Sequence, residues 1–241
     1  MNIGVNNPED YRKEFEETGS VVIRDFLTPD LAESLYTFFN VEMPEEWWST
    51  ATYMPGSEVS YIRNLKENQE LIQSLKESAN KSFYENSLSP DFIGGLTYHF
   101  YRTLNDHHEN CWCKECNFRS WLLSDEMLTF MERVSGDRYT RTFTTFASRY
   151  SEGCFLSPHT DQSNGDIGFV LQLTKDWKPQ WGGNLHFMDD SGFVIEKSEV
   201  PTFNSLTLFR LPDQVGKWHY VSHVNPGVKH HRIAYTGWFL K

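Results

Sequence analysis

The segment Pro-His-Thr-Asp at residues 158–161 places an imidazole and a carboxylate two residues apart. One imidazole and one carboxylate are two of the three ligands in a facial triad, which binds ferrous iron and leaves coordination positions open. His159 and Asp161 are therefore candidate metal ligands. Because a surface turn with an incidental histidine has the same short pattern, this interpretation requires a third ligand from elsewhere in the chain.

A third ligand is available in the histidine-rich segment 218–224, where His219 and His223 stand four residues apart. His219 follows Asp161 by 58 residues, which leaves room for several strands and lets a barrel return it to the first two ligands. Side chains alternate along a strand, so His223 would share a face with His219. Both histidines are candidates on this basis.

The segment 232–238, Arg-Ile-Ala-Tyr-Thr-Gly-Trp, has the composition of a final strand. Period-two alternation predicts that one face carries Arg232, Ala234, Thr236 and Trp238. An arginine that points into a barrel needs an anionic partner, and a carboxylate-bearing cosubstrate that accepts two hydrogen bonds would provide it. The alternative is an ordinary ion pair between Arg232 and one of the 33 acidic residues.

These candidates lie in the second half of the chain, whose sequence is typical of short strands. From Tyr139 onward, segments rich in Thr, Phe, Val, Leu and Trp alternate with turn signals, which predicts about eight strands and a sandwich or jelly-roll barrel. Upstream we expect one strand and three helices, the first with Thr28 as its N-cap, at residues 19–26, 28–39, 68–85 and 124–134. The predicted class is α+β, one domain in which helices and substrate loops (1–138) support the barrel strands (139–241).

Composition excludes several classes of protein. The 241 residues are 39% hydrophobic and 15% aromatic, enough for a sizeable core. A net charge of -11 without any basic run argues against a nucleic-acid binder. No apolar run is long enough to cross a membrane, and no signal peptide or secreted disulfide framework is visible. We therefore expect a cytoplasmic protein.

Taken together, the order His159-x-Asp161, His219 and Arg232-x5-Trp238 resembles the iron(II)/2-oxoglutarate-dependent dioxygenases, specifically the prolyl 4-hydroxylase-like branch. Further matching segments are Arg-Tyr-Ser-Glu-Gly at 149–153, Leu-Gln-Leu-Thr-Lys-Asp-Trp at 171–177, Gly-Gly-Asn-Leu at 182–185 and His-x-Val-x-x-Val at 219–224. The resemblance covers about residues 139–240, with a weaker echo at 19–39. It implies a double-stranded β-helix, the jelly-roll fold also found in cupins.

The resemblance also implies the roles of individual residues. Fe(II) would be held by His159, Asp161 and His219. The distal carboxylate of the cosubstrate 2-oxoglutarate would be bound by Arg232 and Tyr150, with Thr236 lining the same pocket. The implied reaction consumes O2, with ascorbate as a supporting reductant, and forms succinate, CO2 and a hydroxylated substrate. An intact carboxylate at Asp161 implies hydroxylation rather than halogenation.

Two histidines, His219 and His223, compete for the place of the distal ligand. The gap from His219 to Arg232 is 13 residues, longer than is usual in the family, whereas His223 precedes Arg232 by nine. Spacing thus favours His223, and the local His-x-Val-x-x-Val pattern favours His219. Lengthening a turn costs little closure entropy, so we expect His219 to be the ligand.

The substrate is open, with a prolyl residue in a peptide or protein as the leading candidate on family resemblance. The aromatic stretch 42–63 could cover it, stacking on a proline ring, or its aromatic residues could simply pack: Trp47, Trp48, Tyr53 and Tyr61. Alternatives are a hydroxylase of a free amino acid or other small molecule, a non-catalytic jelly-roll that binds a small acid or peptide, and a metal-dependent hydrolase or isomerase. The sequence does not indicate the oligomeric state.

A second metal-like feature is the cysteine cluster at residues 111–116. Thiolates at the spacing of Cys111, Cys113 and Cys116 suit Zn(II), with His107 or His108 as a fourth ligand. Zinc here would be structural and separate from the iron. The alternatives are buried thiols or a redox-labile pair.

Overall fold

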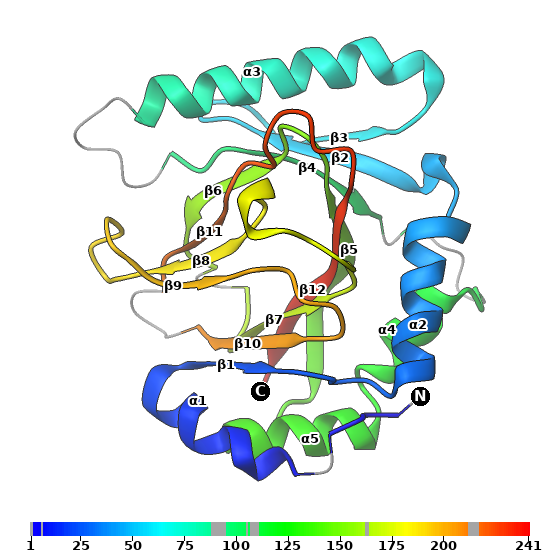
Figure 1. Ribbon diagram of the computed structural model, residues 1–241, viewed down its shortest axis with the longest axis vertical. Coiled ribbons are helices and arrows are strands. Elements are labelled where there is room, and N and C mark those ends of the chain that lie inside the picture. The colour runs from blue at the N-terminus through cyan, green and yellow to red at the C-terminus, as the bar shows by residue number, and fades with distance from the viewer. Residues whose placement is uncertain are drawn as a thin grey trace.

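The computed structural model describes the chain except residues 1, 6, 88–94, 105, 107–110, 162–163 and 212–216. In the described part, the strands pair into one antiparallel sheet that curls into a half-barrel (Figure 1). Its order is β1-β10-β7-β12-β5-β4-β6-β11-β8-β9, and β2 pairs with β3 and β4 beside this path. The strands are β1 (Ser20–Ile23), β2 (Trp48–Tyr53), β3 (Ser60–Arg63), β4 (Tyr98–Thr103), β5 (Arg141–Tyr150), β6 (Phe155–His159), β7 (Ile167–Gln172), β8 (Leu185–Met188), β9 (Ile195–Glu199), β10 (Leu206–Arg210), β11 (His219–Val221) and β12 (Arg232–Leu240).

The predicted α+β class and double-stranded β-helix core are confirmed, and β5 to β12 are the expected eight strands after Tyr139. The helices are α1 (Arg12–Thr18), α2 (Pro29–Thr37), α3 (Gln69–Ser87), α4 (Lys114–Trp121) and α5 (Asp125–Ser135). In Figure 1, α1 and α5 lie below the sheet, α2 and α4 at one side, and α3 above it. Among the described helices, none combines the length and apolar character needed to cross a membrane.

Local sequence explains where the helices begin and end. Ser124 caps α5 by accepting a hydrogen bond from the Met127 N–H at 3.3 Å, and Gly136 ends it in the left-handed region at φ 81°. The start of α2 at Pro29 is as predicted, but Thr28 makes no side-chain cap bond. Pro29 at the first helical position supplies the fixed φ that a helix start needs, so the helix begins without that cap.

The stretch 42–63, for which substrate cover and simple packing were both open, contains the hairpin β2–β3, and β2 pairs with β4. The residues of β2, Trp-Ser-Thr-Ala-Thr-Tyr, are mostly aromatic or β-branched, and Gly56 in the turn has φ 82°, so the strand signals were present. Trp48 is buried in the core and Trp47 packs against it, which identifies both as packing residues.

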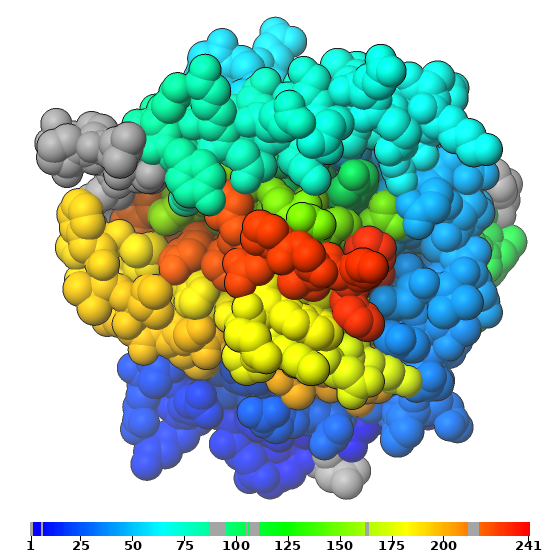
Figure 2. All heavy atoms as spheres, turned by 45° about the horizontal axis from the view of Figure 1, so that its top comes forward, coloured from blue at the N-terminus to red at the C-terminus, as the bar shows by residue number. Residues whose placement is uncertain are grey.

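Two hydrophobic clusters flank the sheet. One joins its outer face to α1, α2, α4 and α5, and the other fills the inside of the curl. On the opposite side, Phe83 and Tyr84 of α3 contact the ring of His223 after β11, with centroids 4.7 and 5.6 Å away. Figure 2 shows α3, in cyan, along the same face as the orange-red chain that follows β11.

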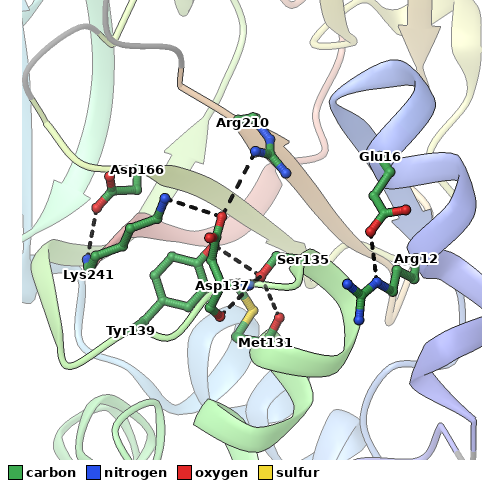
Figure 3. Close-up of polar contacts among 9 residues, drawn as sticks. All are labelled: Arg12, Glu16, Met131, Ser135, Asp137, Tyr139, Asp166, Arg210 and Lys241. Carbon is green, nitrogen blue, oxygen red and sulfur yellow. Dashed lines mark hydrogen bonds and ion pairs between the residues drawn. The ribbon is translucent and has the colours of Figure 1, made fainter.

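The C-terminal end of β12 is fastened to the segments around it (Figure 3). The backbone N–H of Lys241 donates to Asp166 Oδ2 at 2.8 Å, and its Nζ lies 3.3 Å from Asp137 Oδ2. The Tyr139 hydroxyl donates to the Ser135 hydroxyl at 3.0 Å, which anchors the segment around Asp137 to the end of α5. These contacts fix the strand that carries the predicted anion-binding arginine.

Candidate metal centre and cavity

The curled sheet encloses a cavity of about 240 Å³. Strands from both sides of the curl line it, so residues distant in sequence face one space. Its lining comprises Leu96, Tyr98, Phe100, Arg102, Phe146, Ser148, Tyr150, Leu156, His159, Asp161, Asn164, Val170, Leu185, Phe209, His219, Val221, Arg232, Thr236 and Trp238. Every site residue predicted at the barrel is therefore on one surface.

Strand register brings the two histidines together. His159 is the last residue of β6 and His219 the first of β11, and they stand opposite each other in the antiparallel pair. Their ring centroids are 4.3 Å apart. The strands β7 to β10 occupy the long sequence gap between them, as the barrel interpretation required.

Asp161 lies between the two imidazoles. Its Oδ1 is 3.4 Å from His159 Nε2, and its Oδ2 is 3.2 Å from His219 Nε2. One ligand atom from each of the three residues falls within 4.8 Å of the other two. All three side chains are largely shielded from solvent, since their exposed fractions are 13% for His159, 10% for Asp161 and 5% for His219.

Backbone hydrogen bonds fix which nitrogens face Asp161. His159 Nδ1 lies 3.0 Å from the Ser157 carbonyl, and His219 Nδ1 lies 2.9 Å from the Lys217 carbonyl. A carbonyl only accepts, so each Nδ1 carries a hydrogen, and in the neutral ring each Nε2 presents a lone pair. Two lone pairs and a carboxylate that meet at one point need a positive charge between them.

The pKa values at this cluster point the same way. Burial alone would raise the pKa of Asp161, but His219 and His159 hold it well below its usual range. Burial lowers the pKa of His159, and the hydrogen bond and charge of Asp161 raise it above its usual value. The carboxylate is thus an anion in a low-dielectric setting, and a proton or a metal ion must balance it. The donor set fits a divalent metal.

Trp238 contacts the cluster through a hydrogen bond that the sequence analysis did not anticipate. Its Nε1–H donates to Asp161 Oδ2 at 3.0 Å. Its ring also lies near Phe146 and Phe143, at centroid distances of 6.4 and 6.3 Å. Alternation along β12 placed Trp238 on the correct face, but nothing in the sequence paired its indole with Asp161.

Arg232 and Tyr150 lie on a second pair of strands in the same cavity. Arg232 opens β12 and stands opposite Tyr150, the last residue of β5, with its guanidinium carbon 4.9 Å from the tyrosine ring centroid. Arg232 is 2% exposed, and its Nε has no hydrogen-bond partner. No ion pair joins it to a carboxylate among the described residues. Burial lowers the pKa of Arg232 and raises that of Tyr150. A bound carboxylate fits this buried cation.

Of the two remaining candidate residues, Thr236 faces the cavity and His223 does not. Thr236 lines the cavity but donates its hydroxyl to the Phe169 carbonyl at 2.8 Å. His223 lies beyond the end of β11, where its ring stacks on Phe155 at 4.1 Å. It is absent from the cavity lining, so His219 is the histidine that stands beside His159.

Aromatic residues and one arginine line the side of the cavity contributed by β4. Tyr98, Phe100 and Arg102 are every second residue of β4, so their side chains share its inner face. The Arg102 guanidinium lies 3.6 Å from the Phe146 ring centroid, and Tyr53 of the β2–β3 hairpin stacks on Tyr98 at 5.8 Å. The sequence analysis missed this strand, although the alternation in residues 98–103 was available as a signal.

An ion pair between the buried Arg149 and the exposed Glu45 anchors the hairpin region to β5. Arg149 donates to both carboxylate oxygens of Glu45, at 2.8 and 2.9 Å, and lies over the Trp48 and Tyr101 rings at 4.7 Å each. Burial acts to raise the pKa of Glu45, but Arg149 lowers it below its usual value. Arg149 immediately precedes Tyr150, so this pair positions the strand end that faces Arg232.

The cysteines of the second predicted metal site lie at the start of α4. Cys111, Cys113 and Cys116 bring their sulfurs within 4.8 Å of one another. None of them lines the cavity. The histidines proposed as a fourth ligand, His107 and His108, lie outside the described residues.

Comparison with known proteins finds one family that part of the sequence matches. Residues 145–240 match the 2OG-Fe(II) oxygenase superfamily, a range that contains every candidate residue of the barrel site. No curated protein matches the sequence. The predicted resemblance to this superfamily is confirmed.

Two solved structures share the fold. A 2OG-Fe(II) oxygenase family oxidoreductase from Burkholderia pseudomallei aligns with a TM-score of 0.57 at 13% identity, over 99% of this chain and 92% of that chain. A prolyl hydroxylase from Trichoplax adhaerens, in complex with a hypoxia inducible factor oxygen degradation domain peptide fragment, aligns with a TM-score of 0.54 at 16% identity, over 96% and 88%. At these identities the likeness is one of fold.

Proposed function

From the resemblance of residues 145–240 to the 2OG-Fe(II) oxygenases, we propose that this protein is an Fe(II)- and 2-oxoglutarate-dependent oxygenase that hydroxylates an organic substrate, with release of succinate and CO2. His159, Asp161 and His219 would hold the iron. Arg232 and Tyr150 would bind the distal carboxylate of 2-oxoglutarate. The iron, when bound, supplies the activation of O2 that couples decarboxylation of the cosubstrate to hydroxylation.

The observation that carries this proposal is a double fit. Two imidazole lone pairs and one carboxylate converge on a point that needs a cation, in the same cavity as a buried arginine that needs an anion. A metal-dependent hydrolase would need the first group but would have no use for Arg232. A simple acid-binding module would need Arg232 but not the metal donors, and buried polar groups are unfavourable without partners.

The residues around the two groups orient them and exclude water. The Ser157 and Lys217 carbonyls hold the imidazoles with Nε2 inward, and Trp238 orients Asp161. The rings of Phe146 and Phe209 and the side chain of Val170 line the same cavity. Such an apolar surround strengthens electrostatic contacts with a bound acid.

The substrate we propose is a prolyl residue in a peptide or protein. Its supports are the aromatic surface formed by Tyr98, Phe100 and Tyr53, which suits a proline ring, and the fold shared with a prolyl hydroxylase. The net charge of -11 favours a basic peptide. No disulfide joins any of the four cysteines, which supports a reducing, cytoplasmic setting.

The decisive experiment measures succinate from 2-oxoglutarate with Fe(II) and ascorbate, in the wild type and in Asp161→Ala and Arg232→Ala. Matched controls are Asp189→Ala, in the turn between β8 and β9, and Arg138→Ala, on the surface. We expect iron-dependent succinate in the wild type and both controls, and its loss in both site variants. A set of basic proline-containing peptides, compared with free proline, then tests the substrate class.

Binding without turnover has a distinct result. If 2-oxoglutarate protects the iron-loaded protein against thermal unfolding, yet neither peptides nor small molecules yield succinate, the protein is a binding module. If 2-oxoglutarate gives neither succinate nor protection, the proposal is wrong.

A further inference from the structure

We propose that Cys111, Cys113 and Cys116 form a zinc site that fastens the beginning of α4, independently of the proposed oxygenase function. Three sulfurs, rather than two, converge here, all within 4.8 Å of one another. A disulfide between any two would leave the third thiol without a role. Zinc is the ion that three thiolates at short spacing suit, with a nitrogen or oxygen ligand, such as water, in the fourth position.

The geometry requires little adjustment. In a tetrahedral site with Zn–S bonds of about 2.3 Å, neighbouring sulfurs are roughly 3.8 Å apart. The sulfurs lie within 4.8 Å of one another, and even at that bound each would move inward by only about 0.6 Å, which side-chain rotation provides. The three side chains are half-buried, so an ion can reach them from solvent while the protein still shields the site.

Hydrogen bonds already hold the three residues in this arrangement. Cys113 is the N-cap of α4, and its Sγ accepts a hydrogen bond from the Cys116 N–H at 3.4 Å. The side-chain amide of Asn117 donates to the Trp112 carbonyl at 3.0 Å, which ties the residue beside Cys111 to the first turn of the helix. The sulfurs thus meet through the conformation of the backbone as well as through their nearness in sequence.

Burial and the neighbouring Cys113 and Cys111 raise the pKa of Cys116, so three thiolates in contact need a cation between them. The start of a helix carries a partial positive charge that stabilises anions, including a thiolate at the N-cap. Lys114 lies in the same turn, with its Nζ 2.9 Å from Glu42. Three thiolates and one Zn(II) carry a net charge of about -1, and the helix start offsets part of it, since Lys114 is already paired with Glu42.

The site would support the wall of the cavity. Glu115, next to the cluster and fully buried, accepts a hydrogen bond at 2.5 Å from Thr103, the last residue of β4. The Thr103 hydroxyl in turn accepts one from the Ala147 N–H of β5 at 3.0 Å. A metal that holds the first turn of α4 therefore holds the end of β4 and the interior of β5, two strands that line the cavity.

The test separates this zinc from any metal at the histidine site by working in an Asp161→Ala background. Protein is purified under reducing conditions without chelator, and zinc is counted by elemental analysis. We expect about one zinc per chain in Asp161→Ala and in Asp161→Ala with Cys154→Ala, the buried-cysteine control. With Cys111→Ser and Cys116→Ser added to Asp161→Ala, we expect less than about a tenth of that.

A second measurement needs no cysteine variant. Cobalt(II) added to the metal-free Asp161→Ala protein should give strong thiolate-to-cobalt charge-transfer absorption in the near ultraviolet, and X-ray absorption of the zinc form should show three sulfur neighbours and one lighter one. Absence of both zinc and the charge-transfer band overturns the proposal, as does a coordination shell with two sulfurs or fewer. Loss of succinate formation plays no part in either readout.

Discussion

Replacing Trp238 with phenylalanine should weaken metal binding while leaving the cavity filled. The substitution removes the Nε1–H donor that lies 3.0 Å from Asp161 Oδ2. Phenylalanine retains an aromatic ring beside Phe143 and Phe146, so the loss is chiefly one hydrogen bond to a buried carboxylate. Without that bond, Asp161 has less to hold its oxygens toward His159 and His219.

The expected magnitude follows from the type of bond. A hydrogen bond to a charged group contributes about 1.5–3 kcal/mol when its partner is left buried, which converts to roughly 10- to 150-fold in an equilibrium constant. Residues that orient a metal ligand typically change metal affinity by about 10- to 100-fold. We therefore expect the dissociation constant for Mn(II), used as a redox-stable stand-in for Fe(II), to rise about 10- to 100-fold.

The assay is a Mn(II) titration followed by the electron paramagnetic resonance signal of the unbound ion. The matched control is Trp121→Phe, because the Trp121 indole also donates to a carboxylate, Glu126 Oε2 at 2.8 Å, in the region of α4 and α5. The control should lower the free energy of unfolding and leave Mn(II) affinity unchanged. If Trp238→Phe binds Mn(II) within about twofold of the wild type while Asp161→Asn does not bind it, the orienting role of the indole is refuted.

Three further predictions concern groups around the site. Arg232→Met should weaken 2-oxoglutarate binding by at least about 30-fold, measured as the ligand concentration needed to raise Tm, because losing one partner of a buried charge pair costs about 2–5 kcal/mol. Burial, helped by the charge of Lys76, lowers the pKa of His99 to about 3. Below about pH 6.5 the histidine is therefore protonated in the unfolded chain but not in the folded chain. The free energy of unfolding should decrease as the pH is lowered, by up to about 1.4 kcal/mol per pH unit. His99→Asn, which can keep the hydrogen bond to Thr52, should flatten that slope in urea unfolding between about pH 6.5 and 4.5, and an unchanged slope would contradict the assignment. Glu45→Gln should lower Tm near neutral pH and have no effect on Tm in acid. The pKa of Glu45 is lowered in the folded protein, so its carboxylate stabilises the fold above its usual pKa, and this stabilisation is lost as the pH falls.

The residues that the structure brings together as a candidate metal site could be picked out because the chemistry restricts the residue types. His159 and Asp161 stand two residues apart in sequence, and the strand-rich second half of the chain explained how His219 could return to them. Strand parity could not choose between His219 and His223, because it put both on one face; in the structure β11 ends at Val221, so that parity does not extend to His223. The choice came from the local pattern, and the structure places His219 opposite His159.

The parts that escaped prediction depend on contacts between segments that are distant in sequence. The indole of Trp238 meets Asp161 across 77 residues, and Arg149 meets Glu45 across 104. Strand β4 is different, because its alternation was visible in the sequence. It escaped prediction because regular turn signals begin only at Tyr139, downstream of this strand.

The two halves of the site depend on two strand pairs that meet in one cavity. The β6–β11 register sets His159 against His219, and the β5–β12 register sets Tyr150 against Arg232. A slip of one residue in either pair would turn the facing side chains to the opposite face of the sheet, so each register is all-or-none for its function. The hydrogen bond from Trp238 of β12 to Asp161, just after β6, directly joins the β5–β12 pair to the β6–β11 pair. The anion pocket and the metal cluster should therefore be coupled through this indole, and 2-oxoglutarate should raise metal affinity less in Trp238→Phe than in the wild type.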